Sequence, residues 1–238
     1  MEYKLVRSTR RKTIGLQVKL GQVIVRAPAY LSNDDIAKIV KNKSHWLKAK
    51  VALQQERNAA HCANSAIELF VEGCLIWVRG QPKKLQISSA KTSSTYCHGN
   101  YIIVELADRV HRRLLNTEQL KNKVKKQLEK FFIKEAELYI PERLKILSET
   151  VALTPSSYKI RQYKARWGSC NSHQALSFNY LLMMSPDWVV DYVIIHELCH
   201  LKYLNHSSDF WLLVEKFYPE FKKAKQWLID RQTELQWC

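Results

Sequence analysis

The chain has 238 residues, of which 46% are hydrophobic, so it is long enough to bury a core as one large domain or two small ones. No run approaches the roughly 18 uninterrupted apolar residues of a membrane span, and the charged first residues do not resemble an export signal. Six cysteines lie singly without CxxC pairs, which excludes a zinc ribbon and a disulfide-stapled secreted module. We therefore expect a soluble, cytoplasmic protein with reduced thiols and no membrane partner.

The formal net charge is +16, and it is unevenly distributed along the chain. Residues 1–115 contain 20 basic and 8 acidic side chains, whereas residues 116–238 contain 18 and 14. The N-terminal half therefore has a positive field that would attract polyanions such as nucleic acid, nucleotides or acidic protein surfaces. The same surplus also serves solubility, and the sequence does not distinguish the two roles.

The N-terminal half is predicted to be rich in strands, with one inserted helix. Residues 13–18 and 23–27 alternate apolar and polar side chains around Gly21, a pattern typical of a hairpin. Ser32 is the predicted N-cap of an amphipathic helix that continues to about Leu53. Further strand-like segments follow, separated by turn residues, at 67–71, 75–80, 84–88 and 101–106.

The second half begins with a long amphipathic helix. Asn116 and Gln119 resemble a capping box, and apolar residues then recur at helical spacing as far as about Val151, with Pro141 expected to kink or restart the helix. Two strands, at 157–163 and 175–183, are expected to flank a loop. The sequence thus predicts an α+β protein with a β-rich basic part at 1–115 and a helical part at 116–238.

The segment HELCHLKYLNH at 196–206 is the candidate metal site. Ser185, Pro186 and Asp187 predict the start of a helix that contains it, with Ser185 as the capping hydroxyl. On that helix His196 and His200 lie about 40° apart around the axis, so both imidazoles can bind one metal ion. Glu197 lies about 100° from His196, where it can reach a water molecule at the metal and act as general base.

A catalytic zinc ion usually takes three protein ligands, so a third residue is needed. We favour His206, because Asn205 is expected to end the helix in a left-handed conformation and Ser207 to cap the next helix, which puts His206 in a tight corner. Glu215 is the alternative, since other HExxH zinc enzymes take a glutamate from a following helix.

The segments KIRQYKARWGSCNS (159–172), LSFNYLLMMSP (176–186) and DYVIIHELCHLKYLNHSSDFW (191–211) closely resemble the YgjP-like metallopeptidase family. The resemblance covers nearly the whole chain. It implies a zincin-like fold behind the β-rich N-terminal part, with His196, His200 and His206 at the metal positions and Glu197 as the catalytic glutamate. Tyr203 occupies the place of the metzincin glycine, so we expect the helix to continue to Leu204.

In a zincin, the strand before the active-site helix usually borders the cleft and pairs with an extended peptide. In this chain the candidate for that strand is the segment 176–183. Arg166 and Tyr203 are candidates for contact with the substrate or the transition state, where Arg166 could stabilise an oxyanion. The alternative for the RWGSC segment is that Trp167 fills the core and Gly168 serves a turn.

The predicted function is a zinc metallopeptidase with one Zn²⁺ ion, in which Glu197 takes a proton from metal-activated water. Two alternatives stay open. The same site could cleave a phosphoanhydride as a metal-dependent nucleoside triphosphate pyrophosphatase, with the basic N-terminal part holding the nucleotide. The chain could instead be a nucleic-acid-binding protein or a DNA-activated protease, as in the distantly similar SprT-like proteases, and would then bind with strong salt dependence.

Overall fold

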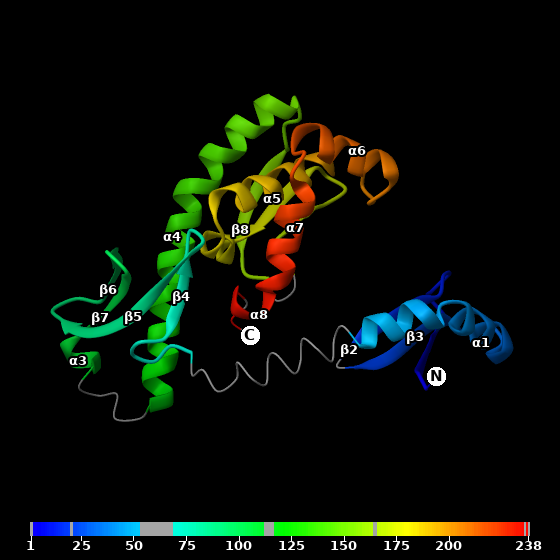
Figure 1. The fold of residues 1–238 in the computed structure, drawn as a ribbon, viewed down its shortest axis with the longest axis horizontal. Coiled ribbons are helices and arrows are strands. Elements are labelled where there is room, and N and C mark those ends of the chain that lie inside the picture. Colours follow the sequence, from blue (N-terminus) through cyan, green and yellow to red (C-terminus); the bar gives the residue numbers. More distant parts are fainter. Residues whose placement is uncertain are drawn as a thin grey trace. The chain divides into compact units, whose positions relative to one another are not determined.

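The computed structural model describes residues 2–19, 21–52, 69–111, 117–163, 166–235 and 237. It is a mixed α+β structure, as predicted, with three separate sheets and a set of C-terminal helices (Figure 1). The chain divides into two compact units, residues 1–67 and residues 68–238. Each unit has its own hydrophobic core.

The first unit is a three-stranded sheet covered by helix α1 (Asn33–Asn42). Strands β2 (Gly15–Lys19) and β3 (Gln22–Pro28) form the predicted antiparallel hairpin. Strand β1 (Lys4–Ser8), which was not predicted, pairs in parallel with β3. The core of this unit consists of buried aliphatic side chains from β3 and from the helical segments: Val23, Val25, Ala27, Ile36, Val40 and Leu47.

The predicted cap of α1 is present, because Ser32 Oγ accepts a hydrogen bond of 3.1 Å from the backbone N–H of Asp35. The helix is shorter than expected. It ends at Asn42 with a turn at Lys43, and residues 44–52 are again helical. The predicted end of the helix at Leu53 lies outside the described residues.

The second unit begins with a four-stranded sheet of order β4-β5-β7-β6, in which β5 and β7 are parallel. Its strands are β4 (Leu75–Val78), β5 (Gln81–Ala90), β6 (Ser94–His98) and β7 (Tyr101–Ala107). The strand predicted at 67–71 is wrong for its described part, because residues 69–70 form a turn. Strand β6 was not predicted.

Helix α4 (Thr117–Val151) follows the short helix α3 (Asp108–His111) and runs without interruption through Pro141. Residue Asn116 of the predicted capping box lies outside the described residues. One face of α4 is completely buried and joins the core formed by β5 and β7; this core includes Leu85, Ile102, Val104, Leu106, Val124, Leu128, Phe132, Ala136 and Ile140. The division between the two compact units falls near residue 67, whereas the sequence placed a boundary between 115 and 116. The strands β5 and β7 share a core with α4, which keeps them in one unit with the helix.

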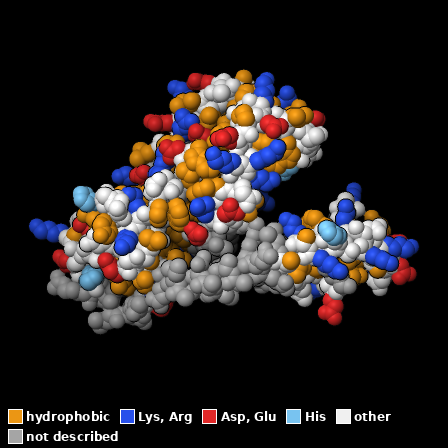
Figure 2. Space-filling view, in the orientation of Figure 1, with side chains coloured by type: hydrophobic (Ala, Val, Ile, Leu, Met, Phe, Trp, Pro, Cys, Tyr) orange, Lys and Arg blue, Asp and Glu red, His pale blue; other side chains and the backbone are white. Residues whose placement is uncertain are grey.

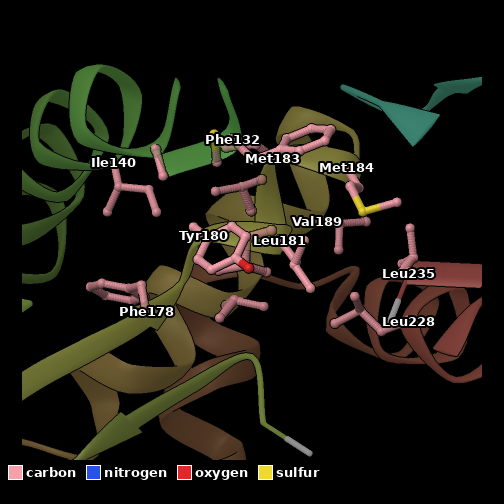
Figure 3. Packing of buried hydrophobic residues seen from close by; sticks show 14 of the residues in the cluster. Phe132, Ile140, Phe178, Tyr180, Leu181, Met183, Met184, Val189, Leu228 and Leu235 are labelled. Carbon is pink, nitrogen blue, oxygen red and sulfur yellow. The ribbon is translucent and has the colours of Figure 1, made fainter. Parts of the chain in front are cut away.

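A second sheet in this unit has the order β8-β10-β9. Strand β8 (Ser157–Arg161) is parallel to β10 (Ala175–Asn179), and β9 (Gly168–Cys170) is antiparallel to it. The predicted strand at 175–183 ends at Asn179, whose side chain accepts a hydrogen bond from the N–H of Leu181 and starts the 3-10 helix η1 (Tyr180–Met184). All five residues of η1 are buried, and Figure 3 shows Tyr180, Leu181, Met183 and Met184 among the side chains of the core.

Four helices complete the chain: α5 (Asp187–Cys199), α6 (Ser208–Phe217), α7 (Phe221–Asp230) and α8 (Gln232–Leu235). Helix α5 packs against α4, α6 and α7 (Figure 1). It is buried along most of its length, which requires it to be apolar on nearly every side. In the described part of the chain, none of the helices combines the length and apolarity needed to cross a bilayer.

Candidate active site

Helix α5 positions the candidate site and starts one residue later than predicted. Its N-cap residue is Pro186, whose carbonyl accepts hydrogen bonds from Val189 and Val190 at 2.9 and 3.2 Å. Ser185 was predicted to be the N-cap of α5, and this prediction is wrong. Its Oγ is buried and has no hydrogen-bond partner among the described residues.

The C-terminal end of α5 also differs from the prediction. The helix ends at Cys199 and does not continue to Leu204, because the N–H of Leu201 bonds to the carbonyl of Leu198 at 3.0 Å and tightens the chain into turns. His200 nevertheless keeps right-handed helical angles, φ −67° and ψ −17°, so it stays on the side of the helix that carries His196. Asn205 does not adopt the expected left-handed conformation.

His200, the second histidine of the motif, is oriented by the turn that follows it. Its Nδ1 lies 2.8 Å from the backbone carbonyl of Tyr203. Because a carbonyl only accepts hydrogen bonds, Nδ1 carries the proton and the lone pair is on Nε2. Ligating histidines in metalloproteins are commonly held by a second-nitrogen contact of this kind.

The tight corner after the turn brings His206 back to α5, as expected. His206 Nε2 lies 3.0 Å from His196 Nε2, and the candidate ligand atoms of His196, His200 and His206 all lie within 4.8 Å of one another. The corner is fixed by Ser207, whose Oγ accepts from the N–H of Phe210 as the predicted cap of α6. Glu215 is not in this cluster: its carboxylate lies 3.7 Å from Lys222 Nζ, and its side chain is half-exposed.

The geometry of the three imidazoles fits a metal ion. Nitrogen ligands about 2.0–2.1 Å from a tetrahedral zinc ion are about 3.4 Å apart. His196 Nε2 and His206 Nε2 are 3.0 Å apart, and no pair of candidate ligand atoms in the cluster is separated by more than 4.8 Å. The rings of His200 and His206 are stacked on Phe210 and Trp211, with centroids 4.4 and 5.5 Å apart respectively. Burial, followed by the charges of His200 and His206, lowers the pKa of His196 to about 3, so this imidazole is neutral, as a metal ligand must be.

Glu197 is buried beside the cluster, with 5% of its surface exposed. Its Oε2 has no hydrogen-bond partner among the described residues. Burial raises the pKa of Glu197 to about 8, and the positive charge of Arg166 partly opposes this increase. A carboxyl group with so strongly perturbed a pKa, next to three histidines, is typical of a catalytic site.

Gly168 in β9 provides the space for Glu197. A Cβ atom on Gly168 would lie 2.6 Å from Glu197 Oε1 and 2.7 Å from its Cγ, both closer than atoms can approach. Gly168 was expected to serve a turn, whereas it lies in strand β9. A glycine inside a strand often marks a place where another group comes close, but the sequence predicted a loop here, so this signal could not be used.

The histidines and Glu197 line a pocket of about 620 Å³. Its walls are β9 with the residues before it, α5, and α7 with the start of α8; the lining residues include Arg166, Gly168, Ser169, Cys170, Tyr192, Val193, Leu204, Lys225, Leu228, Ile229 and Gln232. Arg166 is therefore at the pocket, as predicted. Tyr203 does not line it and contributes its backbone carbonyl to His200, while Tyr192 and Lys225 were not identified from the sequence.

The family of the chain is identified by comparison with known proteins. The model of the YgjP-like family, described as a metallopeptidase domain, matches residues 12–231. Among solved structures, the metallopeptidase zymogen of Pyrococcus abyssi abylysin is 24% identical, with a TM-score of 0.36 over 39% of this chain and 95% of that one. The metallopeptidase zymogen of Methanocaldococcus jannaschii jannalysin is 19% identical, with a TM-score of 0.36 over 39% of this chain and 96% of that one. None of the curated proteins matches the chain.

Proposed function

Since the chain belongs to the YgjP-like metallopeptidase family, we propose that it hydrolyses peptide bonds with one zinc ion held by His196, His200 and His206. The observation that carries the proposal is the convergence of three imidazoles within 4.8 Å beside a buried glutamate in an open pocket. Three neutral nitrogen ligands with space for a fourth are typical of catalytic zinc and leave a position for water.

When bound, a zinc ion supplies Lewis acidity toward water and toward the carbonyl oxygen of the substrate. Glu197 is the general base that accepts a proton from the attacking water and returns it to the leaving amine. The carboxylate form that this requires is favoured by the positive charge of Arg166, which opposes the effect of burial on the pKa of Glu197. The buried ring of Tyr192, one turn before His196 on α5, packs edge-on against the His196 ring at a centroid distance of 5.8 Å.

The substrate is expected to lie along β9 and not along the segment 176–183 favoured from the sequence. Strand β10 in that segment is paired on both sides, with β8 and β9, so it has no free edge. Strand β9 is an edge strand, and Gly168, Ser169 and Cys170 all line the pocket. An extended peptide can therefore add to β9 by backbone hydrogen bonds and place its carbonyl beside Glu197.

A polypeptide substrate is favoured over the nucleotide and nucleic acid partners considered from the sequence. The family match supports a peptidase. On the face of the molecule drawn in Figure 2, Lys and Arg side chains are interspersed with acidic and hydrophobic ones and do not form a continuous basic surface.

The proposal is tested by metal analysis and peptide hydrolysis on the same set of purified variants. Glu197→Gln should bind one equivalent of zinc and lose at least about 100-fold in kcat, because general bases contribute about 10²–10⁴-fold. His206→Ala should lose the stoichiometric zinc, whereas the control Glu215→Ala should keep both the metal and the activity. Parent-level hydrolysis by Glu197→Gln, or loss of zinc only from Glu215→Ala, would overturn the assignment.

A further inference from the structure

Two cationic side chains border the pocket on different walls. Arg166 precedes β9 and Lys225 lies on α7. Within the described part of the chain, neither forms an ion pair with a carboxylate. The one acidic residue among those lining the pocket is Glu197, which is buried. The accessible part of the pocket therefore carries only positive charge.

We propose that this pocket selects peptides with an acidic side chain within about three residues of the bond that is cleaved. The inference rests on the proposed peptidase function and adds to it a substrate class. Aspartate and glutamate side chains would be attracted to the two unpaired cations, and lysine or arginine side chains would be repelled.

Lys225 is held at the histidine side of the pocket. Its Nζ lies 4.6 Å from the centre of the Trp211 ring, which stacks on His206. Lys225, Leu228 and Ile229 all line the pocket and share one face of α7, because residues three and four positions apart lie on the same side of a helix.

Arg166 is exposed and lines the pocket immediately before β9. It precedes Gly168 by two residues, and Gly168 faces Glu197 directly. A peptide along β9 advances about 3.3 Å per residue, so Arg166 would lie beside a substrate residue about two positions from the bond next to Glu197. This spacing sets the range of about three residues in the proposal.

The expected effect is moderate, because both cations are in contact with solvent. Exposed charge pairs contribute about 0.2–1 kcal/mol, which corresponds to an increase in kcat/KM of up to about fivefold for each acidic residue at low ionic strength. The preference should decrease as salt is added, because exposed charges are screened.

The test uses the zinc-loaded full chain and peptides of one sequence. Aspartate, asparagine or lysine is placed in turn at each of three positions on either side of the cleaved bond, and mass spectrometry identifies that bond. We expect kcat/KM to decrease from aspartate to asparagine to lysine at one or more positions. Equal cleavage of all three series would overturn the charge preference and leave the peptidase assignment intact, whereas failure to cleave any peptide would overturn both.

A charge reversal makes the assignment to Lys225 specific. Lys225→Glu leaves Arg166 in place, so the order should reverse only at the substrate positions that face Lys225. There the variant should cleave the lysine peptides better than the parent does, a gain that damage to the fold would not produce. The matched control is Lys223→Glu, which makes the same change of net charge two residues away on the opposite face of α7, where Lys223 Nζ lies 3.8 Å from Glu220. A reversal in both variants, or in neither, would contradict the role of Lys225.

Discussion

Replacing Gly168 by alanine should disable the candidate base without removing the metal. The new Cβ would lie 2.6 Å from Glu197 Oε1, so one of the two residues must move. The backbone of β9 is held by its pairing with Phe178, which is fully buried, and α5 is held by the ion pair of Asp191 with Arg143 at 2.6 Å. The Glu197 side chain is therefore the part that yields. Gly168 does not have a positive φ, so alanine causes no backbone strain of its own.

The size of the expected effect of Gly168→Ala follows from the close approach of the new Cβ to Glu197. Overpacking of this kind costs about 1–3 kcal/mol of folding free energy, and a displacement of about 1 Å at a catalytic group can reduce the rate about 100-fold. We therefore expect Gly168→Ala to bind one equivalent of zinc, to unfold at lower denaturant concentration, and to lose about 100-fold in kcat with little change in KM.

The assay is a double-mutant cycle on the stability of the metal-free protein, measured by denaturant unfolding. In the Glu197→Ala background the clash is absent, so Gly168→Ala should hardly change the free energy of unfolding. The difference between its effects in the parent and in the Glu197→Ala background is the coupling energy between residues 168 and 197. An equal cost in both backgrounds, or a parent-level kcat for Gly168→Ala, would refute the reasoning.

Two further predictions concern the pKa of Glu197 and the support of His206. Burial raises the pKa of Glu197 above its unfolded value, so the stability that this group contributes is complete below about pH 4.5 and is lost as the pH rises to about 8. After zinc is removed with a chelator, denaturant unfolding should show that the parent loses stability relative to Glu197→Gln as the pH rises over that range. If the free energies of unfolding of the two proteins change in parallel with pH, the raised pKa of Glu197 is contradicted. Trp211→Leu removes the ring stacked on His206 and should weaken zinc binding about 10–100-fold in a chelator competition, whereas unchanged affinity would show that the stacking does not orient the ligand.

The sequence was most informative where the relevant contacts are local. His196 and His200 are one helical turn apart, and their relation follows from helix geometry alone. His206 could be placed because Ser207 caps the next helix and leaves few residues for the corner. Even the early end of α5 at Cys199 did not separate the histidines, since His200 keeps helical angles and the turn is stabilised through Tyr203.

Contacts between distant segments could not be read in the same way. Alternation and helical periodicity show which face of an element is buried, but not which element covers it. For this reason the strands at 75–107 and helix α4 were assigned to different parts of the chain, although they share one core in the structure. Strand β9 has three residues, too few for an alternating pattern, so neither its pairing with β10 nor the approach of Gly168 to Glu197 was visible.

The frame that holds the histidines depends on residues far from the motif. Arg79, in the turn between β4 and β5, lies 2.8 Å from Asp187 at the start of α5, and its guanidinium stacks 3.5 Å over the ring of Tyr139 in α4. The next residue, Gly80, has φ +77°, and a Cβ there would lie 2.7 Å from Pro186. Because this turn also bonds to η1 through the Arg79 and Gly80 N–H groups, it fixes the start of the helix whose other end carries the candidate ligands. The four-stranded sheet, which contributes no residue to the pocket lining, thus positions the site through α5.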